Sequence, residues 1–330
     1  MQKQINLHNM SVQLKTRNLL LPFISCLLPL LVSCQSGLDE APSQEGECTV
    51  NFLVTNYRQI SFDDLSSAST RSPASTIPTD HPSTLRHLLI AVFDAETNQQ
   101  VCSPIQHDQS DYEESDKWEA YRQFSITLPY GHYRVLILGF NGDKTCHITS
   151  PEQVTWSADY VPNTFLYCEE LTLDKNATLD RKITLRHVVA AFRLRAEDAI
   201  PAELKKMRFI SSAGGTVLDA TTGYAKQNTG RISNIEISSD KVGEKEMDFT
   251  VYLFLPEEEI TANYTVQALG ENDNPLYSKH FMNVPLRINV MTAWQGAMFE
   301  NTGDDDDTVY PFGINLYWDT AWADTIRLTP

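Results

Sequence analysis

Short runs in which apolar and polar residues alternate recur along most of the chain, and this pattern restricts the fold more than any other feature. A period of two places every second side chain on the same face of a β-strand. Examples are "CTVNFLVTN" at 48–56, "FLYCEELTL" at 165–173 and "MDFTVYLFLP" at 247–256. These runs are rich in β-branched and aromatic residues, which favours strands over helices. Turn signals separate the runs about every 8–12 residues, so the sequence predicts an all-β protein built from β-sandwiches.

The remaining segments refine this prediction. The stretch 85–102 is typical of a strand, a polar turn and a returning strand, and 121–144 predicts a hairpin turned at Pro129-Tyr130-Gly131. A long strand is predicted over 182–198, and 198–206 is expected to form one or two helical turns with Pro201 near their start. Further strands are predicted at 205–212, 263–271, 276–284, 288–299 and 310–318.

The first 33 residues have the pattern of a lipoprotein signal peptide. Lys3, Lys15 and Arg17 precede an apolar run at 19–32 that contains two prolines. At 14 residues the run is shorter than the roughly 20 that a membrane-spanning helix needs. "LVSC" at 31–34 resembles a bacterial lipobox, in which the Cys34 thiol receives a diacylglycerol and cleavage makes Cys34 the first residue. Further acylation, typically with palmitate, makes such an anchor stable. The alternative is an ordinary signal peptide with a chance cysteine.

The length of the chain allows two domains with cores of their own. Cleavage before Cys34 leaves 297 of the 330 residues. Residues 34–47 are small, polar and acidic, which is typical of a flexible tether. The polar stretch 173–182 separates two groups of strands. We therefore expect a signal peptide at 1–33, a tether at 34–47, an N-terminal β-sandwich at 48–178 and a C-terminal one at 179–330.

Charge excludes one class of partner. The formal net charge is −17, and removal of the signal peptide with its three basic residues brings it to −20. Such a chain repels nucleic acid and anionic lipid head groups, so its attachment to a membrane must come from the lipid.

Cysteine usage leaves two alternatives open. Cys48, Cys102, Cys146 and Cys168 remain after Cys26 leaves with the signal and Cys34 is lipidated. They form either one or two structural disulfides or a set of buried thiols, and the pairing does not follow from the sequence. No C-x-x-C is present, which argues against a zinc or thioredoxin-type site.

No motif for catalysis or for a cofactor is present. The sequence contains no G-x-S-x-G, H-E-x-x-H, P-loop or G-x-G-x-x-G. His87 and His187 are interpreted as strand histidines, and Gly214-Gly215 as a hairpin turn. The run Asp304–Asp307 is interpreted as a solvated acidic loop, because consecutive aspartates point in alternating directions and cannot converge on calcium. We therefore expect no enzymatic activity, no cofactor and no metal site.

Several segments, taken in order, resemble the fimbrillin superfamily of type V fimbriae, and in particular its lipoprotein branch of anchor and accessory subunits. The likeness begins with the lipobox and "CTVNFLVTNYRQ" and continues with "HLLIAVFDAETNQQV" and "ITLPYGHYRVLILGFNG". It ends with "LRHVVAAFRLRAED" and "VPLRINVMTAWQGAMF", and so covers nearly all of the mature chain. The resemblance implies two tandem transthyretin-like Greek-key β-sandwiches and subunits that join by β-strand addition.

The resemblance also implies roles for particular segments. Stalk subunits of this family are opened by proteolysis after an arginine near the N-terminus, and the nearest candidate here is Arg71, which is otherwise an ordinary loop arginine. An anchor subunit would keep its N-terminal strand and its lipid. The C-terminal segment 310–330 is the candidate for donation to a partner, or else the last strand of its own domain.

Two functions remain in view. The first is a fimbrial subunit that is anchored by lipid at Cys34 in the outer membrane and exposed at the cell surface. Its partners are other fimbrial subunits, and it serves cell adhesion through a host or bacterial surface ligand. The alternative is a surface lipoprotein that binds glycans through exposed aromatic side chains, for which Trp294, Trp318 and Trp322 are candidates. Buried tryptophans would favour the first function, and exposed coplanar ones the second.

Overall fold

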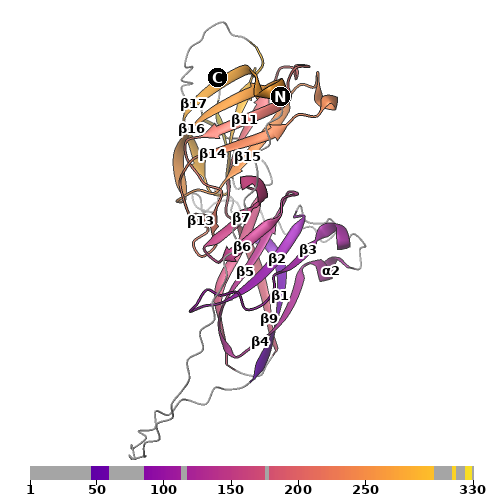
Figure 1. Ribbon diagram of the computed structural model, residues 1–330, viewed down its shortest axis with the longest axis vertical. Helices are drawn as coiled ribbons and strands as arrows, with labels where there is room; N and C mark the ends of the chain where they lie inside the picture. The colour runs from indigo at the N-terminus through magenta and orange to yellow at the C-terminus, as the bar shows by residue number, and fades with distance from the viewer. Residues whose placement is uncertain are drawn as a thin grey trace, which may run out of the picture. The chain divides into compact units, whose positions relative to one another are not determined.

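The computed structural model describes residues 46–58, 85–112, 117–174, 178–300, 314–316 and 324–328. Nearly all regular structure in these ranges is β-strand, arranged in four sheets (Figure 1). The predicted all-β fold is thereby confirmed. The helical segments in the same ranges are short: α2 (Trp118–Tyr121) and the 3₁₀ turns η1 (Gln109–Tyr112), η2 (Ser157–Asp159), η3 (Ser239–Lys241) and η4 (Glu271–Asp273).

A seven-stranded sheet forms the first sandwich. Its order is β3 (Ile105–Asp108), β2 (His87–Asp94), β5 (Gly131–Phe140), β8 (Thr164–Leu173), β9 (Thr178–His187), β1 (Glu47–Arg58) and β4 (Gln123–Pro129). Apolar side chains from both halves of this sheet, among them Ile90, Ile137, Phe52 and Ile126, belong to one buried cluster. The sheet therefore curves around its own core, because only then can strands from its opposite edges share that core.

Two sheets form the second sandwich. One has the order β15 (Met247–Leu253), β10 (Ala190–Ala196), β18 (Val290–Gly296), β20 (Asp324–Leu328) and β19 (Ile314–Leu316). The other has the order β14 (Arg231–Glu236), β11 (Lys206–Ser211), β16 (Glu259–Leu269) and β17 (Pro275–Arg287). Their facing side chains form a core rich in aromatic residues, in which Phe192 stacks on Tyr264 at 4.4 Å between ring centroids and meets Phe281 edge-on at 5.6 Å.

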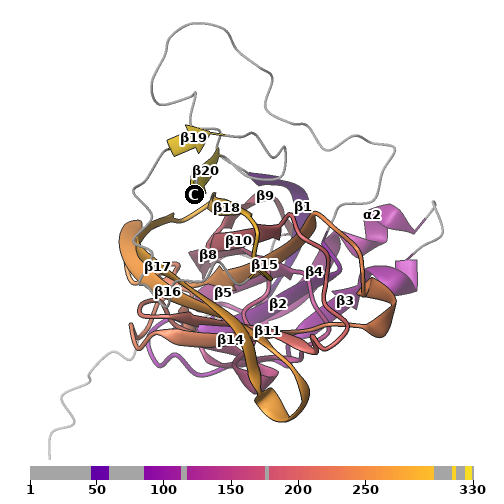
Figure 2. The ribbon, with the colours of Figure 1, turned by 90° about the horizontal axis from the view of Figure 1, so that it is seen from above.

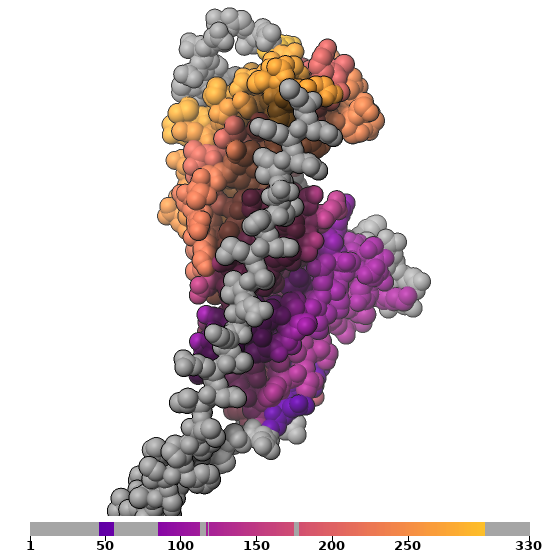
Figure 3. Space-filling model, viewed as in Figure 1, coloured from indigo at the N-terminus to yellow at the C-terminus, as the bar shows by residue number. Residues whose placement is uncertain are grey.

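A small fourth sheet connects the two sandwiches. Its order is β13 (Tyr224–Ala225), β12 (Leu218–Asp219), β7 (Gln153–Trp156) and β6 (Cys146–Ser150), with Leu218 opposite Val154 (Figure 1). A third buried cluster lies beside it and combines Trp156 and Phe140 with Phe254 from the second group of strands. In Figure 3 the atoms of the earlier strands adjoin those of the later ones. The two sandwiches thus share a core and are not independent of each other.

One predicted hairpin is present and the other is wrong. β2 pairs with β3 in antiparallel fashion, but the returning strand begins at Ile105, beyond the predicted range 85–102, within which Gln100 forms an isolated bridge to Phe93. β4 and β5 are separated only by Tyr130 but do not pair with each other, since β4 pairs with β1 and β5 pairs with β2 and β8. The burial patterns give the reason. β5 is buried on both faces along most of its length, which is typical of a central strand with two neighbours, whereas β4 alternates as an edge strand does.

The long strand predicted over 182–198 is two strands in different sheets. β9 ends at His187 in the seven-stranded sheet, and β10 begins at Ala190 in the five-stranded one. The change of sheet therefore falls at Val188-Val189, both fully buried. β9, which begins at the predicted domain boundary 178/179, belongs to the seven-stranded sheet. The predicted limits of the signal peptide and most of the tether lie outside the described residues.

The helix expected at 198–206 and the hairpin turn expected at Gly214-Gly215 are also wrong. Ile200 and Leu204 are buried four residues apart, and this spacing imitates a helix. A 3.1 Å bond from Leu204 N to the carbonyl of Pro201 closes a single turn, and the flanking backbone bonds to distant segments, as in the 2.8 Å bond from Lys205 N to the carbonyl of Leu269. β12, which follows the glycine pair, contacts β7 and β13 and does not return along β11.

Candidate functional site

The first candidate site is strand β1. It lies inside the seven-stranded sheet, parallel to β9 and antiparallel to β4 (Figure 2). The register pairs Phe52 with Phe124 of β4 and with Arg181 of β9. An N-terminal strand in this position has both of its hydrogen-bonding edges occupied, and its removal would leave β4 and β9 each with a row of unpaired backbone groups.

Alternation along β1 explains why it occupies that position. Cys48, Val50, Phe52 and Val54 are buried in the core of the first sandwich. The outward-facing Thr49 lies 2.9 Å from the hydroxyl of Thr127 on β4. Burial of a valine or phenylalanine side chain stabilises the fold by about 1.5–3 kcal/mol, so the apolar face of β1 contributes on the order of 6 kcal/mol.

Asn51 connects the outward face of β1 to both neighbouring strands. Its Nδ2 donates to Oδ1 of Asp180 on β9 at 2.9 Å, and its Oδ1 accepts from Ser125 on β4 at 2.8 Å. One side chain therefore contacts both walls of the slot that β1 fills.

The second candidate site is formed by the C-terminal strands. β20 pairs in parallel with β18, from Val290 opposite Asp324 to Trp294 opposite Leu328, and β19 pairs with β20 (Figure 2). β18 is buried along almost its whole length and has β10 on its other side. A strand of this kind needs two neighbours, and the end of the chain supplies the second.

The structure tests only some of the residues singled out in the sequence. Cys34 and Arg71 lie outside the described residues, as do Asp304–Asp307, Trp318 and Trp322. Trp294 is buried with 1 % of its surface exposed, so it is a core residue. The parallel pairing of β1 with β9 was not predicted, because two segments so far apart in the chain carry no local signal of their pairing.

Cys102, Cys146 and Cys168 are thiols that do not pair with one another. Burial raises the pKa of Cys146 to about 12 and that of Cys168 to about 11. Neither is a thiolate at neutral pH, so neither has the character of a nucleophile.

Both strand histidines are confirmed and both have partners. His87 begins β2, with Nδ1 at 2.6 Å from the Asp108 carboxylate and Nε2 at 2.8 Å from the carbonyl oxygen of Gly142. His187 ends β9 between the amides of Asn163 and Asn289. Burial lowers the pKa of His187 to about 4, so its ring is neutral at physiological pH.

Two absences hold for the described ranges. They contain no cluster of three or more side chains with the geometry to hold a metal ion. No helix within them combines the length and the apolar character that crossing a bilayer requires.

These features define a class: an all-β protein of two sandwiches with a shared core, whose N-terminal strand is inserted into a sheet. Residues 42–327 match the sequence model of DUF6562, described as a family of unknown function. The chain belongs to this family. No curated protein matches it in sequence.

Solved structures that resemble the chain include proteins from Bacteroides and Porphyromonas. A "putative adhesin" from Bacteroides ovatus has 11% sequence identity and a TM-score of 0.41, over 71% of this chain and 77% of that one. The fimbrial anchor protein Mfa2 from Porphyromonas gingivalis has 12% identity and a TM-score of 0.33, over 71% of this chain and 82% of that one. The C-terminally truncated tip fimbrial protein Mfa3 from the same organism has 10% identity and a TM-score of 0.30, over 72% of this chain and 81% of that one.

Proposed function

We propose that the protein is a lipid-anchored subunit of a surface fimbria, an anchor or accessory component that joins other subunits by β-strand addition and has no enzymatic activity. In this proposal Cys34 carries the lipid, the outer membrane holds the protein at the cell surface, and the partners are other fimbrial subunits. The lipobox and the ordered resemblance to fimbrillin lipoproteins support it.

The observation that carries the proposal is the position of β1. Only a short stretch, 35–46, separates Cys34 from the first residue of this strand. A lipid on Cys34 would therefore be connected directly to a strand that is paired on both sides. A subunit that keeps β1 stays attached to the membrane, whereas one that loses it after cleavage at Arg71 is both released and opened.

The slot filled by β1 has the properties that strand addition requires. Its walls are the backbones of β4 and β9, and its floor is the apolar core of the first sandwich. A strand that alternates as β1 does could replace it, because backbone hydrogen bonds give affinity and alternate side chains give specificity. In an anchor the slot stays filled, and the C-terminal segment with β19 and β20 is the part offered to a partner.

The burial of Trp294 weighs against the glycan-binding alternative in the form considered from the sequence. Its ring lies in the second core and meets Phe281 edge-on at 5.4 Å. A side chain in that position cannot stack on a sugar without unfolding its surroundings.

Purification of the protein from its native envelope with the lipid intact, followed by mass spectrometry, tests the proposal. We expect an N-terminal Cys34 that carries acyl chains, an intact peptide spanning Arg71, and fimbrial subunits in the same complex. Cys34→Ser is the matched control and should appear in the soluble fraction. A lipidated chain that purifies alone would contradict the assembly role, and a mature N-terminus at residue 72 would identify a stalk-type subunit instead of an anchor.

A further inference from the structure

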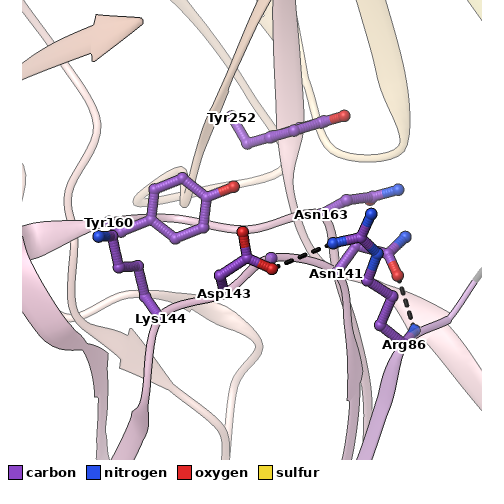
Figure 4. A pocket seen from close by; sticks show the side chains of 8 residues that line it. Arg86, Asn141, Asp143, Lys144, Tyr160, Asn163 and Tyr252 are labelled. Atoms are coloured by element: carbon purple, nitrogen blue, oxygen red, sulfur yellow. Dashed lines mark hydrogen bonds and ion pairs between the residues drawn. The ribbon is translucent and has the colours of Figure 1, made fainter. Parts of the chain in front are cut away.

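A polar cavity of about 570 Å³ lies beside the shared core and is not part of the assembly strands. Its lining comes from three segments of the first sandwich and one strand of the second: Arg86, Asn141, Gly142, Asp143, Lys144, Tyr160, Asn163 and Tyr252. Figure 4 shows the Asp143 carboxylate between the Tyr160 ring and the Arg86 guanidinium, with a dashed line joining Asp143 to Arg86. Cavities of this volume are ordinary for small ligands.

Several contacts hold the lining in place. Oδ1 of Asn141 accepts from the backbone N of Arg86 at 2.8 Å, and Nε2 of His87 lies 2.8 Å from the carbonyl oxygen of Gly142. Gly142 has a φ of +129°, and a Cβ at this position would lie only 2.7 Å from the ring of Tyr160. The glycine thus allows the tyrosine ring to approach the backbone closely.

The charges around the cavity favour an anion. Arg86 contacts Asp143 at 3.1 Å, so these two largely offset each other. Lys144 is exposed and has no carboxylate partner among the residues that the structure describes. In a chain of net charge −17, a cavity whose cations outnumber its carboxylates is unusual.

A buried arginine behind the lining adds to this positive potential. Arg231 is 9 % exposed, and its Nη1 donates to the carbonyl oxygen of the lining residue Tyr252 at 2.5 Å. Its Nε has no hydrogen-bond partner, and the carboxylate of Asp159 acts on it only through space, without an ion pair in the described ranges. Burial lowers its pKa only to about 10, so the group stays charged at neutral pH and its charge is poorly screened by water.

The other side chains suit a ligand with hydroxyl groups and an apolar face. Tyr160 and Tyr252 are half-buried, and both pack against the shared core. The carboxylate of Asp143, exposed over 88% of its side chain, can accept hydrogen bonds from hydroxyl groups. The same carboxylate would repel the double charge of a phosphate group more strongly than the single charge of a sugar carboxylate.

We propose that this cavity binds a saccharide that carries a carboxylate, such as a hexuronic acid residue of an acidic glycan. Lys144 would meet the sugar carboxylate, Asp143, held by Arg86, would accept from its hydroxyl groups, and the tyrosine rings would contact its ring face. The inference goes beyond the proposed assembly role and does not depend on it, because it concerns residues that neither β1 nor the C-terminal strands supply.

Calorimetric titration of the full-length chain in detergent with digalacturonate tests this inference. The dimethyl ester of the same disaccharide is the neutral comparison. We expect the acid to bind at least about tenfold more tightly than the ester, because one charge-assisted hydrogen bond supplies a difference in affinity of that size. This difference should shrink as sodium chloride is added. Since only the isolated chain is used, a failure here leaves the fimbrial proposal untouched.

Variants identify the residues responsible. Lys144→Met should weaken binding of the acid about tenfold and leave binding of the ester unchanged. Lys205→Met, which removes an exposed lysine outside the cavity, should bind like the wild type. Tyr160→Ala should lose both ligands while its circular dichroism spectrum stays that of a β-protein. The inference would be overturned by equal affinity for acid and ester, or by no binding of either at millimolar concentration. It would also be overturned if Lys144→Met bound the acid as tightly as the wild type does, or if phosphate or a peptide carboxylate bound more tightly than the acid.

Discussion

Truncation of Phe52 to alanine measures how firmly β1 is held in its sheet. The side chain is 3 % exposed and lies in the core of the first sandwich, opposite Phe124 in the register of β4. Loss of a buried phenylalanine costs about 3–5 kcal/mol, because the transfer free energy and the cavity left behind add together. Domains have a free energy of unfolding of about 5–15 kcal/mol, so Phe52→Ala should remove about a fifth of it or more.

Urea unfolding followed by circular dichroism gives that free energy, and hydrogen exchange of the peptide covering β1 shows where the loss falls. Thr49→Ala is the matched control on the outward face of the same strand. It loses only an exposed hydroxyl contact with Thr127 and should cost about 0.5 kcal/mol. If Phe52→Ala costs less than about 1 kcal/mol, or no more than Thr49→Ala, then β1 is not a core strand and the argument from its position fails.

Three further outcomes are expected. As the pH falls from 6.5 toward 4, His187 takes up a proton in the unfolded chain but not in the folded chain, where it is buried. The free energy of unfolding should therefore drop by on the order of 3 kcal/mol. Urea titrations of His187→Gln should show a weaker dependence of that free energy on pH over the same range. Cys146 and Cys168, whose pKa values are raised to about 12 and 11, should react with iodoacetamide slowly in the native chain and rapidly in urea, and equal rates would contradict their burial. Gly142→Ala should lower the free energy of unfolding by about 1–3 kcal/mol, since the added methyl group strains the backbone and pushes against Tyr160. Thermal unfolding would measure this loss.

Local patterns in the sequence predicted the strands well and their partners poorly. β1, β8 and β11 begin and end within a few residues of the predicted limits, because alternation and β-branched residues are local signals. The pairing of β1 with β9 and the separation of β4 from β5 depend on which faces are buried in the folded chain. The doubly buried character of β5 is visible as the continuous apolar run "VLILGF", which could have indicated a central strand.

The polar cavity had no signal in the sequence for a different reason. Arg86, Asp143, Tyr160 and Tyr252 lie in segments that are far apart in the chain and belong to both sandwiches. Each residue alone is ordinary for a loop or an exposed strand position. Only the fourth sheet and the shared core bring them together, and that contact between sandwiches follows no short-range pattern.

The geometry of β1 also determines how the protein would respond to mechanical force. If Cys34 is held in a membrane and the rest of the chain is pulled away, tension enters at Glu47 and runs along the strand axis. The pairing of β1 with β9 extends from Thr49 to Arg58, and that with β4 from Glu47 to Leu53. The hydrogen bonds on both sides lie across the pull and must break together in shear, instead of opening one at a time from an end. Detachment under load would then be governed by the rate of that single step.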